Sequence, residues 1–75
     1  MESLNQNITI WLGKRIRFFR LKNNLSQEEL ADRCDLHRTY IGSCERGERN
    51  ITVKNLHKIC GALNVNLSEF FSGIE

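Results

Sequence analysis

Residues 26–46, SQEELADRCDLHRTYIGSCER, decide the fold, because they predict two short helices joined by a tight turn. Ser26, followed three residues later by Glu29, forms a capping box, which marks the start of a helix. That helix is expected to end at Cys34, and Leu36 lies at the bend. Apolar or small residues at helical spacing indicate the buried side of both helices: Leu30, Ala31, Cys34, Leu36, Ile41 and Cys44. His37 fits the N-cap of the second helix. The polar residues expected on the surface of that helix are Arg38, Thr39, Tyr40 and Ser43.

The sequence before this stretch predicts another helix over residues 7–22, which ends at Asn23 and Asn24. Its apolar positions recur every three or four residues, at Ile8, Leu12, Ile16 and Phe19. Trp11 and Phe18 form a second stripe beside them. This stripe is either additional core or a surface for a partner.

The sequence after the stretch predicts two more helices. Gly47 is expected to end the preceding helix as a C-cap glycine. Thr52 then caps a helix, and Asn66 with Glu69 opens the last one. The apolar face of the helix after Thr52 comprises Val53, Leu56, Ile59, Cys60 and Leu63. Alternation of β-branched residues is sparse and proline is absent, so the predicted fold class is all-α, a compact five-helix bundle.

Composition indicates one small domain over residues 1–75, with 40% apolar and 27% charged residues. No apolar run reaches the roughly 18–20 residues that span a bilayer, and no signal segment is evident, so a cytoplasmic location and no membrane contact are expected. The net charge of +2 is modest, but five of the eleven basic residues fall within positions 14–22. They are Lys14, Arg15, Arg17, Arg20 and Lys22.

Three features argue against a metal, a cofactor or an enzyme. The cysteines Cys34, Cys44 and Cys60 are odd in number and lack metal-ligand spacing. We interpret them as small core residues, with a redox-sensing thiol as the alternative. His37 and His57 are 20 residues apart, and no carboxylate pair or glycine-rich loop has catalytic spacing. We therefore expect no metal site, no cofactor and no catalytic residue.

The segment from residue 12 to residue 65 resembles the helix-turn-helix domain of phage-repressor-type (XRE-type) regulators, a lambda-repressor-like DNA-binding domain. Within that group, HRTYIGSCERGERN at 37–50 resembles the controller proteins of type II restriction–modification systems. The resemblance implies a homodimer on a pseudo-palindromic DNA operator, which activates its own gene and the endonuclease gene and represses both at high occupancy. The alternatives are a stand-alone phage or metabolic repressor of the same fold and an antitoxin-type protein-binding module.

The resemblance also assigns regions and conformations. The helix-turn-helix spans about residues 26–46, and the dimerisation region about residues 60–75. Its turn needs a left-handed backbone where relatives usually carry glycine, and Asp35 occupies this position. Aspartate is among the few other residues that tolerate this conformation, so we expect the turn to form. Arg20 and Glu45 match a structural ion pair of the repressors.

The same resemblance predicts DNA contacts. For base readout the residues are Arg38, Thr39 and Ser43; for the DNA backbone they are Gln27, Tyr40, Arg46, Arg49 and Asn50. The alternative for Arg38 is a phosphate contact, and for Arg46 and Arg49 it is simple solvation.

Two protein interfaces are predicted as well. The dimer interface comprises Leu67, Phe70, Phe71 and Ile74, because they carry more apolar surface than a terminal helix would bury. The alternative is that Leu67 and Phe70 belong to the core. Glu28 and Asp32 are candidates for contact with RNA polymerase, with an ordinary solvated helix face as the alternative.

Overall fold

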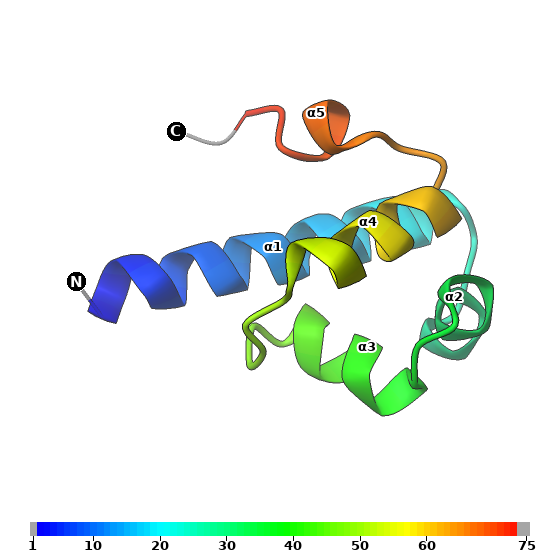
Figure 1. The fold of residues 1–75 in the computed structure, drawn as a ribbon, viewed down its shortest axis with the longest axis horizontal. Coiled ribbons are helices and arrows are strands. Elements are labelled where there is room, and N and C mark those ends of the chain that lie inside the picture. The colour runs from blue at the N-terminus through cyan, green and yellow to red at the C-terminus, as the bar shows by residue number, and fades with distance from the viewer. Residues whose placement is uncertain (1, 74–75) are drawn as a thin grey trace.

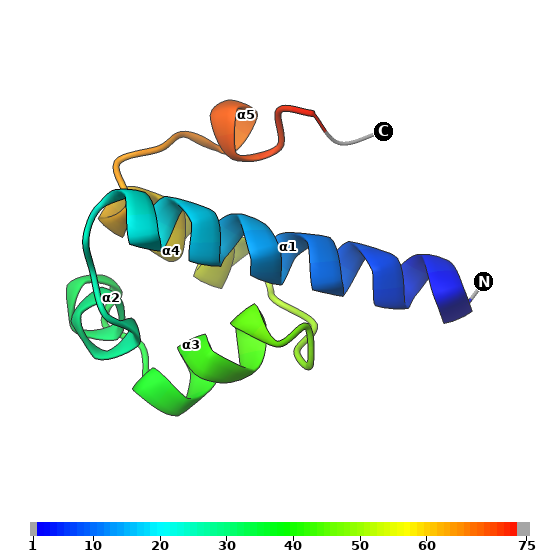
Figure 2. The ribbon, with the colours of Figure 1, turned by 180° about the vertical axis from the view of Figure 1, so that it is seen from behind.

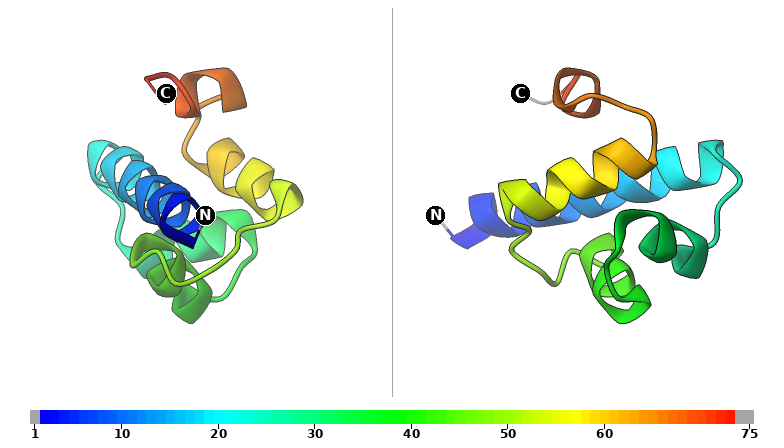
Figure 3. Two further views of the ribbon diagram at one scale, coloured as in Figure 1. Left: turned by 90° about the vertical axis from the view of Figure 1, so that its left-hand side faces the viewer. Right: turned by 45° about the vertical axis from the view of Figure 1, so that its right-hand side comes forward.

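The computed structural model describes the backbone of residues 2–73 and the side chains of residues 8–73. The described residues form five helices and no strand: α1 (Glu2–Lys22), α2 (Gln27–Cys34), α3 (Arg38–Glu45), α4 (Val53–Ala62) and α5 (Leu67–Phe70). The predicted all-α fold is confirmed. In the view of Figure 1, α1 and α4 cross the middle of the molecule, with α3 on one side and α5 on the opposite side. The same separation is visible from behind (Figure 2) and in the two side views (Figure 3).

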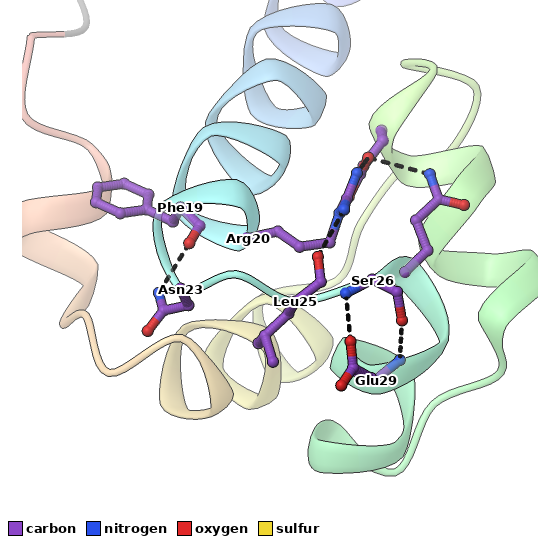
Figure 4. Close-up of polar contacts among 8 residues, drawn as sticks. Phe19, Arg20, Asn23, Leu25, Ser26 and Glu29 are labelled. Carbon is purple, nitrogen blue, oxygen red and sulfur yellow. Dashed lines mark hydrogen bonds and ion pairs between the residues drawn. The ribbon is translucent and has the colours of Figure 1, made fainter.

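Helices α2 to α5 begin where the sequence predicts, because each has a side chain that accepts a hydrogen bond from a free backbone N–H. The capping residues are Ser26, His37, Thr52 and Asn66. The capping box of α2 is complete (Figure 4): Ser26 Oγ accepts from Glu29 N at 3.0 Å, and Glu29 Oε1 accepts from Ser26 N at 2.8 Å. This pairing lowers the pKa of the Glu29 carboxyl.

The turn between α2 and α3 has the expected left-handed residue, since Asp35 has a φ of 57°. The end of α3 also turns through a positive φ, at Gly47. A Cβ on Gly47 would lie 2.9 Å from Cγ1 of Ile10 in α1. Glycine at position 47 therefore satisfies both the backbone conformation and the close approach of α1.

One buried cluster draws side chains from all five helices. Its members are Ile16, Phe19, Leu25, Leu30, Ala31, Cys34, Ile41, Cys44, Leu56, Ile59, Cys60, Leu63 and Phe70. Most residues of the predicted apolar faces belong to this cluster, and Leu12 and Leu36 are partly buried against it. Ile8 and Val53 are instead exposed, by 36% and 73%. Val53 is the first residue of α4, whose buried face begins one turn later at Leu56. The structure also begins the first helix at residue 2 rather than residue 7.

The second apolar stripe of α1, formed by Trp11 and Phe18, was expected to be either additional core or a partner surface, and its two residues differ. Trp11 is half-buried and stacks on Phe71, with ring centroids 5.9 Å apart. Phe18 is 53% exposed. Trp11 is therefore additional core, and Phe18 lies on the surface.

The short α5 is held against α1 by Arg15. Its Nε donates to the backbone O of Phe70 at 2.9 Å, and its Nη2 donates to the backbone O of Glu69 at 3.0 Å. The Arg15 guanidinium also lies 4.9 Å from the ring centroid of Phe19. Among the described residues, no helix has both the length and the apolar character needed to cross a membrane.

Candidate nucleic-acid interface

The position of α3 is fixed by a buried ion pair with α1. Arg20 Nε lies 2.6 Å from Glu45 Oε2, and Arg20 Nη2 lies 3.0 Å from Glu45 Oε1. The two side chains are 8% and 4% exposed. The third nitrogen of Arg20, Nη1, donates to the backbone O of Leu25 at 2.8 Å (Figure 4). The hydrogen bonds with Glu45 raise the pKa of Arg20, so Arg20 stays charged.

A close approach of two backbones supports this ion pair. A Cβ on Gly13 of α1 would lie 2.4 Å from the backbone O of Cys44 in α3. Glycine therefore lets α1 contact the last turn of α3 directly, beside Glu45. Gln27, at the start of α2, adds a hydrogen bond from Nε2 to Glu45 Oε1 at 3.1 Å. The carboxylate of Glu45 thus joins α1, α2 and α3.

The first turn of α3 is exposed. His37 Nδ1 accepts from Thr39 N at 3.0 Å, which fixes the start of the helix. Arg38 and Thr39 follow directly and face solvent. Arg38 Nη1 lies 2.8 Å from Glu28 Oε2, and these side chains are 68% and 63% exposed. An ion pair this exposed contributes little, so Arg38 can exchange Glu28 for another acceptor at small cost.

A shallow pocket between α2 and α3 brings several predicted contact residues together. Its lining includes Gln27, Arg38, Thr39 and Arg46, together with Glu28. Arg46 is exposed, and its Nε donates to Glu48 Oε2 at 3.1 Å. The pocket therefore combines the cations of Arg38 and Arg46 with an amide and a hydroxyl. It includes the N-terminal residues of α2 and α3, where the helix dipoles also favour an anion, whereas Arg46 follows the end of α3.

The prediction that Ser43 lies on the surface is wrong. Ser43 is 5% exposed, and its Oγ donates to the backbone O of Tyr40 at 2.8 Å. The same Oγ accepts from Arg49 Nε at 3.0 Å. The loop after α3 folds back over this position, so Ser43 holds Arg49 and does not present a free hydroxyl.

Arg49 also lies over an aromatic ring of α3. Its Cζ is 5.5 Å from the ring centroid of Tyr40, a distance typical of a cation–π contact. Tyr40 is half-buried, whereas Arg49 and Asn50 are exposed. Two contacts on α3 therefore give Arg49 a defined place beside the pocket residues.

Two of the basic residues in the run at positions 14–22 of α1 make contacts within the fold. Arg15 binds the end of α5, and Arg20 is buried in its ion pair. Lys14, Arg17 and Lys22 are exposed. The density of positive charge in residues 14–22 therefore does not mark a nucleic-acid surface by itself.

The residues predicted for the dimer interface differ in exposure. Phe70 is fully buried in the core of its own subunit, so it offers no surface to a partner, and its place in that interface is wrong. Leu67 and Phe71 are partly buried against the same core. Ile74 lies outside the described residues.

All three cysteines are buried, in agreement with their interpretation as core residues. Burial raises the pKa of each thiol, and that of Cys60 to about 11. A thiol with a raised pKa forms little of the reactive thiolate at neutral pH, which disfavours the alternative of a redox sensor.

One polar residue of this region was missed by sequence analysis. Asn55, in the first turn of α4, donates from Nδ2 to Tyr40 Oη at 3.2 Å. No local pattern identifies it, because the two residues are 15 positions apart and belong to different helices.

Comparison with known families gives a match to the helix-turn-helix family over residues 16–70. Among individual proteins, the control protein C.BamHI of Bacillus amyloliquefaciens is 51% identical over 63 residues, which cover 83% of this chain and 78% of the relative. Both the match of the family model and this relative cover the region that contains α2, α3 and the ion pair.

Two solved structures share the fold closely. The restriction–modification controller protein C.AhdI of Aeromonas hydrophila has a TM-score of 0.84 and 38% identity, covering 87% of this chain and 98% of that one. The controller protein C.Esp1396I, solved as a tetramer in complex with its natural 35 base-pair operator, has a TM-score of 0.80 and 38% identity. That match covers 84% of this chain and 83% of the other.

Proposed function

The chain belongs to the helix-turn-helix transcriptional regulators, among the controller proteins of restriction–modification systems, and we propose that it binds a pseudo-palindromic operator upstream of its own gene as a homodimer. In this proposal it acts in the cytoplasm, activates its own gene and the endonuclease gene at low occupancy, and represses them at high occupancy. The related C.Esp1396I in complex with its operator supports the DNA partner.

The observation that carries the proposal is the exposed start of α3. Arg38 and Thr39 project from a helix whose two ends are fixed, by the His37 cap and by the Arg20–Glu45 ion pair. An α-helix fits the major groove, and arginine and threonine side chains bind base edges there. Gln27, Tyr40, Arg46, Arg49 and Asn50 are assigned to the DNA backbone around this helix. Ser43 acts through Arg49, not on a base.

A gel shift with DNA from immediately upstream of the gene tests the function. If Arg46 and Arg49 of two subunits neutralise four phosphates, log affinity should fall against log salt with a slope of about −4. Binding of the upstream fragment over unrelated DNA of equal length is the expected result. No preference for that fragment would favour a regulator of distant genes, and no DNA binding at all would favour an antitoxin-type module.

We assign the dimer interface to Leu67, Phe71 and Ile74 at the C-terminal end. Helix α5 lies on the opposite side of α1 from α3, so a partner beside α5 leaves α3 accessible (Figure 1). Phe71→Glu should shift the protein from dimer to monomer in sedimentation, because a carboxylate cannot be buried unpaired in an apolar interface. Ser72→Glu changes the exposed neighbour and is the control. A folded Phe71→Glu protein that remains dimeric would reject this interface.

Contact with RNA polymerase is assigned to the acidic surface of α2. Asp32 is the better position to test, because Glu28 is paired with Arg38 and its replacement would also alter the DNA-binding surface. Asp32→Lys is expected to reduce activation of a promoter reporter severalfold and to leave operator affinity unchanged. Equal activation by the variant and the wild type would exclude Asp32 from the polymerase contact.

A further inference from the structure

A chain of polar contacts joins the start of α4 to the DNA-facing side of α3. Asn55 Nδ2 donates to Tyr40 Oη at 3.2 Å, and the Tyr40 ring lies 5.5 Å from Cζ of Arg49. Arg49 Nε donates to Ser43 Oγ at 3.0 Å, and Ser43 Oγ donates to the backbone O of Tyr40. We call these four residues the Asn55–Arg49 relay. It links two helices and the loop between them.

The relay starts from a rigid point. Asn55 is the third residue of α4, and its backbone N donates to Oγ1 of the capping Thr52 at 3.1 Å. The backbone of Asn55 is therefore fixed by the helix cap, which leaves the side-chain amide to hold the hydroxyl of Tyr40. Tyr40 itself belongs to α3, so its side chain extends from the backbone of α3 to the amide of Asn55.

The relay ends at a cation with free donors. Arg49 is exposed, and its Nε is directed to Ser43. Within residues 8–73, no acceptor binds its Nη1 or Nη2. The guanidinium is thus oriented through one nitrogen and one face, while the remaining donors point to solvent.

From this arrangement we infer that Asn55 is a positioning residue for DNA binding, which acts through the Tyr40 hydroxyl to keep Arg49 oriented before the operator arrives. The inference rests on the proposed function. A long side chain that is ordered in advance loses less conformational freedom on binding, and this loss otherwise weakens the complex. Asn55 is half-buried and its amide is directed at Tyr40. In this inference it therefore affects DNA binding through Tyr40 and does not contact DNA itself.

The first test uses the free protein and needs no DNA. Tyr40 is the single tyrosine of the chain, so phenolate absorbance reports its ionisation alone. Burial raises the pKa of Tyr40, and the hydrogen bond from Asn55 opposes this rise because it favours the phenolate. Asn55→Ala should therefore raise the pKa of Tyr40 further. An unchanged pKa would overturn the link between the two residues.

The second test is a double-mutant cycle on operator DNA with Asn55→Ala, Tyr40→Phe and the double variant. Asn55→Ala alone should weaken operator binding roughly three- to tenfold per bound subunit, as expected for one side chain that must be ordered on binding. In the Tyr40→Phe background the same replacement should have no further effect, because the hydroxyl that it acts through is absent.

Controls separate this role from loss of fold and from failure of the proposed function. Asn23→Ala removes a comparable amide away from α3 and should leave operator affinity unchanged. Asn23 Nδ2 donates to the backbone O of Phe19, as Figure 4 shows, and to the backbone O of Leu63. Equal losses from Asn55→Ala in both tyrosine backgrounds, or no loss in either, would overturn the inference. If the wild type itself binds no operator, the proposed function fails, and the tyrosine titration still decides whether Asn55 holds Tyr40.

Discussion

Replacing Glu45 with alanine is expected to lower the free energy of unfolding by about 3–5 kcal/mol, because it leaves the charge of Arg20 buried without a partner. Arg20 is 8% exposed on its side chain and loses two of its three hydrogen bonds in this variant. Gln27 loses its acceptor at the same time. Small domains have total stabilities near the lower end of about 5–15 kcal/mol, so the variant should retain only a small part of its stability. Urea unfolding followed by circular dichroism measures the difference.

The second ion pair of the same region provides the matched control. Glu28→Ala also removes a carboxylate from an arginine, but Arg38 and Glu28 are both about two-thirds exposed. Its effect on stability should stay below about 1 kcal/mol. Glu45→Gln keeps the shape of the buried side chain without its charge and should fall between the two. A loss for Glu45→Ala as small as that for Glu28→Ala would mean that the buried pair does not fix α3.

Much of the fold could be predicted because its signals are local. A capping side chain and the N–H that it binds are two or three residues apart, so Ser26, His37, Thr52 and Asn66 marked their helices in the sequence alone. Asp35 was predictable for a similar reason, since few residue types tolerate its backbone conformation. Helical spacing of apolar residues then indicated most of the core.

The errors have a common physical cause, which is contact between segments distant in the sequence. Ser43 has a polar side chain beside an apolar stripe, and nothing local shows that the loop with Arg49 folds back over it. Phe70 appeared as surplus apolar surface, because the hollow that receives it is formed by residues far along the chain, such as Phe19 and Trp11. Asn55 was missed for the same reason.

Exposure alone does not assign the proposed DNA contacts, because side chains of similar exposure can bind either bases or phosphates. Arg38 and Arg46 line the same pocket, and both are paired with nearby glutamates, at 2.8 Å and 3.1 Å. Their positions relative to α3 differ. Arg38 is its first residue, at the end that enters the major groove in this motif, whereas Arg46 follows its last turn. This difference predicts distinct effects on specificity.

Arg38→Ala is accordingly expected to weaken operator binding by about 1–3 kcal/mol per half-site and to remove discrimination at one base pair in each. A homodimer carries the replacement twice, so the total loss is about 2–6 kcal/mol, roughly 30-fold to 10⁴-fold in affinity. The physical reason is the guanidinium fork, which donates two parallel hydrogen bonds to O6 and N7 of guanine. The half-sites should lie about 10 base pairs apart, centre to centre, so that both α3 helices meet one face of the duplex.

Affinities for the operator and for a scrambled site, measured at one salt concentration, distinguish base readout from phosphate contact. Arg38→Ala should lose much more affinity on the operator than on the scrambled site, whereas Arg46→Ala should lose similar factors on both. Arg38→Lys retains the charge without the fork, so it should recover binding to the scrambled site but not the preference for the operator. Equal losses on both sites for Arg38→Ala would assign Arg38 to a phosphate and leave base readout at the start of α3 to Thr39.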